Sequence, residues 1–205
     1  MLDQSKNMQE PTSTTPHRHF ILHKPFGYLS QFKLVTNKKV QLLGSLYDFP
    51  EKTMSIGRLD KDSEGLLFLT TNGKASALIT GRKIEKEYYV QVDGIITPEA
   101  IQRMEQGIEI SIKGEKYTTL PCIAARLYTP PNFPPRTKRL RDDRHGPTSW
   151  VAITIREGKF RQVRKMTAVV GFPTLRLLRV RIGKEWLGDL KAGEVREVDS
   201  FKLGF

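Results

Sequence analysis

Residues 57–70 are Gly-Arg-Leu-Asp-Lys-Asp-Ser-Glu-Gly-Leu-Leu-Phe-Leu-Thr. The second half, from Gly65 to Leu69, is short and apolar, which predicts a strand buried on both faces of a sheet. The first half places charged side chains in a loop directly before that strand, where a rigid scaffold can hold functional groups. Arg58 next to Asp60 would favour the ionised form of that carboxylate. The stretch therefore predicts a buried strand that begins at a functional loop.

The rest of the chain predicts a mixture of strands and helices. In residues 86–92, Tyr88, Val90 and Val92 share one strand face. In residues 178–182, the same alternation places Arg179 and Arg181 on one face. We expect strands at 65–69, 86–92, 150–155 and 178–182, and helices at 74–79, 97–106 and 161–170. Because tight turns as well as helices separate the strands, the predicted fold class is α+β.

The charge of the chain indicates a polyanionic partner. Lys and Arg outnumber Asp and Glu by 34 to 22, a net charge of +12. Residues 126–165 alone hold eleven basic and three acidic residues, or +8 of that total. Within them lies a Pro-rich basic segment, about 129–148, which we expect to be a long exposed loop. Its cations Lys138, Arg139 and Arg141 are candidate phosphate contacts, and a solvated insertion is the alternative.

Composition also bears on the domain organisation and on the cellular compartment. Residues 1–19 are polar and predict a disordered tail, so the folded domain is expected over 20–205. The chain has one cysteine, Cys122, which excludes an internal disulfide framework and favours a reducing compartment. No apolar run approaches the roughly 20 residues of a membrane helix. We therefore expect a cytoplasmic monomer without a metal site, since the few histidines and Cys122 are scattered.

Two other chemistries fit part of the acidic loop. Asp60, Asp62, Glu64 and Gly65 match positions 1, 3, 5 and 6 of a calcium loop. That loop needs a bidentate Glu at position 12, where this chain has Thr71, and a helix where a buried strand is predicted. A glycosidase with two carboxylates is the second candidate. Such a basic chain suits a phosphate-rich ligand better than a neutral sugar.

Several motifs together resemble one family. Residues 57–70 closely resemble the catalytic motif of RsuA-type ribosomal RNA pseudouridine synthases. Residues 23–27, His-Lys-Pro-Phe-Gly, are similar to the opening motif of that family. Residues 86–90 and 157–166 are similar to its second and third motifs. The resemblance spans about residues 20–198 in family order. It implies a central mixed, mainly antiparallel sheet in two subdomains, with an active cleft between them.

The resemblance also implies roles for single residues. The reaction is the isomerisation of uridine in RNA, with Asp60 as the carboxylate that acts on the nucleotide. Arg164 is implied to pair with Asp60. Tyr88 is implied to stack on the flipped base, although its strand face by itself assigns it to the core. The family motif gives no chemistry to Asp62 or Glu64, so substitutions there are expected to be mild.

The expected contacts with RNA come from basic residues at several motifs, namely Lys24, Arg58, Arg161 and Lys165, besides the three cations of the Pro-rich segment. Many relatives carry an extra RNA-binding module before the catalytic domain, and the residues before Phe20 are too few for one. We therefore expect residues 126–165 to select the RNA, a large-subunit ribosomal stem-loop or a pre-ribosomal particle. No cofactor is implied. A non-catalytic RNA-binding or ribosome-assembly protein and a base-removing glycosylase remain the alternatives.

Overall fold

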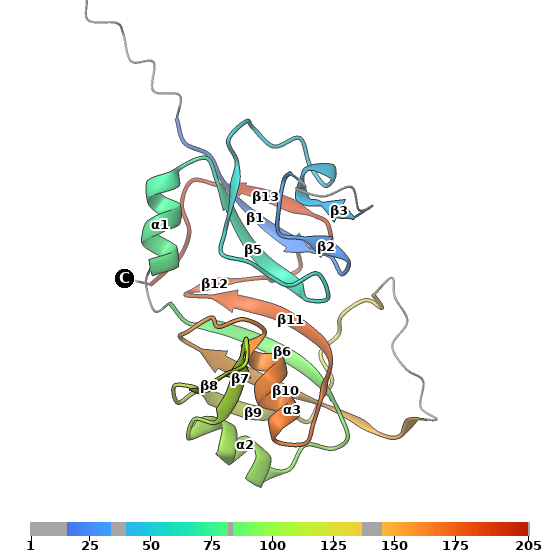
Figure 1. Cartoon of the computed structure of the whole chain (residues 1–205). Coiled ribbons are helices and arrows are strands. Elements are labelled where there is room, and N and C mark those ends of the chain that lie inside the picture. The colour runs from blue at the N-terminus through green and yellow to red at the C-terminus, as the bar shows by residue number, and fades with distance from the viewer. Residues whose placement is uncertain (1–15, 34–39, 82–83, 137–144, 205) are drawn as a thin grey trace, which may run out of the picture.

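A nine-stranded sheet forms the centre of the computed structural model, which describes residues 16–33, 40–81, 84–136 and 145–204 (Figure 1). The strands along the sheet are β13 (Val195–Val198), β1 (His19–Lys24), β5 (Glu64–Thr70), β11 (Thr174–Ile182), β6 (Lys86–Asp93), β10 (Thr148–Ile155) and β9 (Ile123–Leu127). In addition, β4 (Met54–Ile56) pairs with β5, and β12 (Glu185–Trp186) pairs with β11. Within this sheet, β5 and β11 are parallel and the other described pairs are antiparallel.

The remaining elements divide between the two halves of the sheet. One half carries α1 (Gly73–Gly81), the 3-10 helix η1 (Leu43–Ser45) and the pair β2 (Tyr28–Leu29) and β3 (Gln41–Leu42). The other half carries α2 (Pro98–Glu105), α3 (Gln162–Val169) and the hairpin β7 (Glu109–Ile112) and β8 (Glu115–Thr118). Strands β11 and β12 lie between these halves (Figure 1). The predicted α+β class, with a mixed and mainly antiparallel sheet in two subdomains, is confirmed.

Strand β5 is buried along its whole length, as its apolar composition predicts. Its parallel neighbour β11 approaches Gly65 so closely that a Cβ atom there would lie 2.3 Å from the Arg179 carbonyl oxygen. Gly65 also has a φ of +105°, a conformation that residues with a side chain rarely adopt. Glycine is therefore required where the motif loop enters the sheet.

The three helices confirm the local signals of the sequence. Helix α2 begins after Thr97, whose side chain accepts a hydrogen bond from the backbone N–H of Ala100, and Pro98 takes the first helical position. Helix α3 ends before Gly171, which has a φ of +94°. None of the helices in the described residues is long and apolar enough to span a bilayer.

The alternation predicted for β11 is wrong at its end. The pairing of β11 with β6 shifts register between Arg179, opposite Tyr88, and Arg181, opposite Glu87. Such a bulge inserts one residue, and a one-residue shift turns the following side chains to the other face. Arg181 consequently bonds Glu87, whose side chain points away from Tyr88, while Arg179 remains on the Tyr88 face.

The two segments predicted to be unstructured are described only in part. Residues 1–15 lie outside the described residues, and β1 already begins at His19, where the tail was expected to end. Residues 137–144, with Lys138, Arg139 and Arg141, also lie outside them. In residues 130–136, four side chains are exposed as predicted, and the other three, Pro131, Phe133 and Arg136, are partly buried. The guanidinium of Arg136 lies 4.6 Å from the ring centre of Phe26, and Phe133 packs against Trp150.

Candidate active site

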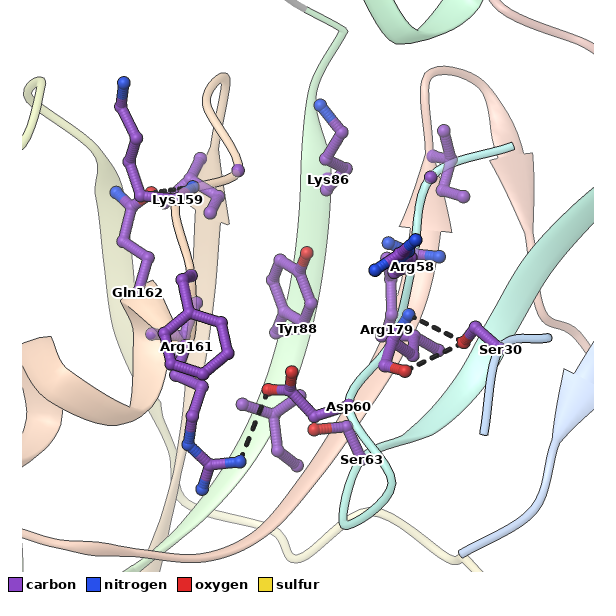
Figure 2. Close-up of a pocket in the computed structure, with 18 of the residues that line it drawn as sticks. Ser30, Arg58, Asp60, Ser63, Lys86, Tyr88, Lys159, Arg161, Gln162 and Arg179 are labelled. Carbon is purple, nitrogen blue, oxygen red and sulfur yellow. Dashed lines mark hydrogen bonds and ion pairs between the residues drawn. The ribbon is translucent and has the colours of Figure 1, made fainter. Parts of the chain in front are cut away.

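A cavity of about 850 Å³ lies between the two halves of the sheet. Its walls come from residues 57–63 before β5, from β6 and β11, and from residues 155–164 before and within α3. Figure 2 shows Tyr88 of β6 in the middle, with Arg58 and Arg179 to one side of it in this view, and Arg161 and Lys159 to the other. Asp60 lies at the end of the cavity opposite Lys86 in the same view. The structure thus has a cleft where the resemblance implies one.

The loop that carries Asp60 is held by its neighbours on both sides. The hydroxyl of Ser30 accepts a hydrogen bond from Leu59 N at 3.0 Å and donates one to Leu59 O at 2.8 Å. On the other side of Asp60, the N–H of Gly27 donates to Lys61 O at 2.8 Å. These bonds fix the backbone and leave the Asp60 carboxylate, about 31% exposed, in the cleft.

The cation at Asp60 is Arg161, whose Nη1 lies 3.6 Å from Asp60 Oδ2. Arg161 also donates two hydrogen bonds to the carboxylate of Asp62, at 2.9 and 2.8 Å. It precedes α3 with a φ of +52°, a left-handed conformation that costs roughly 1–2 kcal/mol for a residue with a side chain. The strained backbone holds its guanidinium between the two carboxylates. Arg161, which is expected to contact RNA, also organises the acidic loop.

Arg164 does not make the predicted ion pair with Asp60. Its Nη2 donates to Asp62 O at 2.7 Å, and its Nε lies 3.6 Å from Asp62 Oδ2. Burial acts to raise the pKa of Asp62, but the hydrogen bonds from Arg161 and the charges of Arg164 and Arg161 outweigh it, and that pKa is lowered. Arg164 and Arg161 therefore hold the loop through an ionised Asp62. The family motif gives Asp62 no chemistry, and the structure gives it a positioning role, because it bonds both arginines.

Tyr88 belongs to the hydrophobic core and also lines the cleft. Its side chain is only 8% exposed and belongs to a cluster with Val90, Ile153 and Leu177. It also lines the cavity, between the walls that carry Arg161 and Arg179 (Figure 2). Among the residues that the structure describes, none forms a hydrogen bond with the Tyr88 hydroxyl. The two interpretations of Tyr88 are therefore compatible, since packing holds the ring rigid at the wall of the cleft.

Lys24 is wrongly predicted as an RNA contact. It is 0% exposed, and its Nζ donates to Pro25 O at 3.0 Å and to Tyr28 O at 2.8 Å. Burial lowers the pKa of Lys24 to about 7, although the nearby carboxylate of Glu64 opposes that shift. A side chain so enclosed cannot reach phosphate. It shapes the turn at 25–28, and Gly27 of that turn bonds the loop that carries Asp60.

Two other predicted RNA contacts, Arg58 and Lys165, are less enclosed than Lys24. Arg58 is exposed and lines the cavity. The Nζ of Lys165 donates to Ser111 O and lies 5.2 Å from the ring centre of Phe160, an aromatic side chain that is 57% exposed. Because an ammonium group has three donors, Lys165 retains others for a phosphate. Arg161 and Arg164 line the same cavity, and their guanidinium groups bond Asp62 of the acidic loop.

Sequence reasoning missed four residues around the site. Ser30 supports the loop, and Lys86 and Arg179 line the cavity. Arg176 forms a buried ion pair with Glu64, with distances of 2.9 and 3.0 Å. No local pattern marks these residues, because each acquires its role from a partner distant in sequence. Among the described residues, no three His, Cys, Asp or Glu side chains gather as a metal site would require.

Comparison with known proteins identifies the family. The model of the RNA pseudouridylate synthase family matches residues 18–169 of the chain. The chain belongs to this family. It is 40% identical to ribosomal large subunit pseudouridine synthase E of Vibrio parahaemolyticus, over 87% of this chain and 72% of that protein. It is 38% identical to the protein of that name from Xanthomonas campestris, over 88% of this chain and 95% of that protein.

A solved structure agrees in fold over most of the chain. The crystal structure of a pseudouridylate synthase has a TM-score of 0.69 and 29% sequence identity, over 89% of this chain and 70% of that one. The predicted enzyme class, an RNA pseudouridine synthase, and the predicted fold are confirmed by these matches. Asp60, Tyr88 and Arg164 all lie within the matched residues.

Proposed function

We propose that this protein converts a specific uridine of large-subunit ribosomal RNA to pseudouridine, with Asp60 as the catalytic carboxylate. The proposal takes its substrate class from relatives named ribosomal large subunit pseudouridine synthase E. One observation of the site carries the chemistry. The loop on both sides of Asp60 is fixed by hydrogen bonds, and its carboxylate lies in the cleft within 3.6 Å of a cation.

The reaction detaches uracil from C1′ of the ribose and rejoins the two through a carbon–carbon bond. A base inside a helix is out of reach, so the target uridine must leave the stack and enter the cleft. Tyr88 offers a rigid aromatic face to that base. Asp60, whose carboxylate lies 3.6 Å from Arg161, then attacks the nucleotide or removes a proton from the sugar. Arg164 and Asp62 hold the loop in position for this step.

The positive charge of the chain supports RNA as the ligand. The proposed phosphate contacts are Arg58, which lines the cavity, Lys165, which lies beside Phe160 of the cavity wall, and Lys138, Arg139 and Arg141 of the Pro-rich segment. The cytoplasm is the proposed site of action, because bacterial relatives modify ribosomal RNA by name.

Asp60→Asn tests the proposal. Asn has nearly the same shape and cannot act as a carboxylate, so pseudouridine formation in a single turnover should be abolished while RNA binding is retained. Asp48→Asn is the matched control, because Asp48 is exposed, does not line the cavity, and changes the net charge equally. The substrate is a large-subunit RNA fragment, or a pre-ribosomal particle if naked RNA is not bound. Pseudouridine formed by Asp60→Asn at the parent rate would refute the assignment.

A further inference from the structure

Strand β11 carries three arginines, and two of them have carboxylate partners. Arg176 bonds both oxygens of Glu64, and Arg181 bonds Glu87 at 2.8 Å. Arg179, between them in sequence, is only 4% exposed and donates its Nε to Leu66 O at 2.8 Å. Within the described part of the chain, no carboxylate lies within 4 Å of Arg179, and its buried Nη2 has no hydrogen-bond partner.

An uncompensated charge of this kind is costly. Burying a cation without a partner costs several kcal/mol, so proteins usually pair such groups. Other cations add to the cost here. Burial and the charge of Arg179 both lower the pKa of Lys86, which lines the same cavity. The cleft therefore has an excess of positive charge on the wall formed by β6 and β11, which an anion from the substrate would balance.

The position of Arg179 relates that charge to the base. Arg179 is paired in register with Tyr88 across β11 and β6, and both line the cavity. Directly opposed residues of antiparallel strands have Cβ atoms about 5 Å apart on one face of the sheet. A base stacked on the Tyr88 ring would thus present its edge to the Arg179 guanidinium. Figure 2 shows both side chains on the cavity wall above the Asp60 carboxylate.

The chemistry of the proposed function produces an anion at this place. When the C1′–N1 bond breaks, its electron pair stays on the base, and the negative charge is shared by N1, O2 and O4. C5 of the same base then forms the bond to C1′, and the proton released from C5 is balanced by protonation of N1. No external oxidant or reductant takes part. The step most in need of stabilisation is the one that creates the uracil anion.

We propose that Arg179 is a catalytic residue that donates hydrogen bonds to a carbonyl oxygen of the uracil anion as the glycosidic bond breaks. The inference rests on the proposed function and adds to it a residue for the leaving base. It explains why the arginine between two paired neighbours has no protein anion. A preorganised donor aimed at developing charge is worth about 10²–10³-fold in rate in other enzymes.

The test is Arg179→Gln, which removes the charge and keeps a donor for Leu66 O. Arg103→Gln is the matched control, since Arg103 is exposed on α2 and does not line the cavity. We expect the single-turnover rate of Arg179→Gln at saturating RNA to fall by roughly 10²–10³-fold, with the Kd for RNA unchanged. Arg179→Lys, which keeps the charge, should recover part of that rate.

A change of leaving group separates this role from a structural one. In RNA with 5-fluorouridine at the target, fluorine stabilises the base anion, so glycosidic cleavage should depend less on Arg179. Loss of 5-fluorouridine from the digested RNA reports that cleavage. The fall caused by Arg179→Gln should therefore be smaller with 5-fluorouridine than with uridine. Equal falls for the two substrates would overturn the proposal, because a distorted site would slow both alike.

Other results would refute the inference in different ways. Arg179→Gln could keep the parent rate but bind RNA with a raised Kd, and the slope of log affinity against log salt could fall by about one. That result would show that Arg179 contacts a phosphate. An unchanged rate and Kd with a lower Tm would make it a structural residue. A parent protein that forms no pseudouridine would instead refute the proposed function, and so the two failures are distinguishable.

Discussion

Breaking the buried ion pair of Glu64 and Arg176 with Glu64→Gln should destabilise the protein strongly. The side chain of Glu64 is 3% exposed and that of Arg176 is 8% exposed, and two hydrogen bonds join them. Removing one partner of a buried pair leaves the other charge uncompensated and costs about 3–5 kcal/mol. In a chain of 150–250 residues, each kcal/mol shifts Tm by roughly 2–4 °C, so Tm should fall by roughly 6–20 °C.

Equilibrium unfolding in urea measures this loss. The control is Glu197→Gln, which breaks an exposed ion pair with Arg18. The side chains of Arg18 and Glu197 are 42% and 43% exposed, so this change should have little effect on stability. Replacing both buried partners, Glu64→Leu with Arg176→Met, should recover most of the stability. Because Glu64 does not line the cleft that holds Asp60, the folded variant should keep its single-turnover rate. A loss no larger than that of Glu197→Gln would refute the reasoning.

Two further predictions concern Lys24 and Tyr88. The folded state releases the Lys24 proton near pH 7 and the unfolded state near 10.5, so between these values the unfolded state binds more protons. Urea unfolding of the parent and of Lys24→Met at several pH values measures this effect. The stability difference, parent minus variant, should increase by up to about 1.4 kcal/mol per pH unit above pH 7. A difference that does not change with pH would contradict the prediction. Tyr88→Phe should keep RNA binding, since the ring remains, while Tyr88→Ala should weaken it by about 1–3 kcal/mol. Full turnover by Tyr88→Ala together with a lowered Tm would show that Tyr88 has only a structural role in the core.

Local sequence predicted the elements well and their side-chain partners poorly. The apolar run at 65–69 and the alternation at 86–92 predicted β5 and β6, because burial on one or two faces imposes its own period on the chain. Thr97 and Pro98 marked the start of α2, because capping depends on neighbours in sequence. The bulge after Arg179 was not predictable, since it arises from the pairing of β11 with β6.

The sequence by itself determined the family and the position of the proposed catalytic carboxylate, because the motif around Asp60 is contiguous in the chain. Only the tertiary structure decided which cationic side chains pair with which carboxylates. Arg161 rather than Arg164 lies at Asp60, and Lys24 is enclosed rather than exposed. Charge is a property of composition, whereas burial and pairing depend on contacts between segments far apart in the chain. For that reason the unpaired Arg179 became visible only when β5, β6 and β11 were placed together.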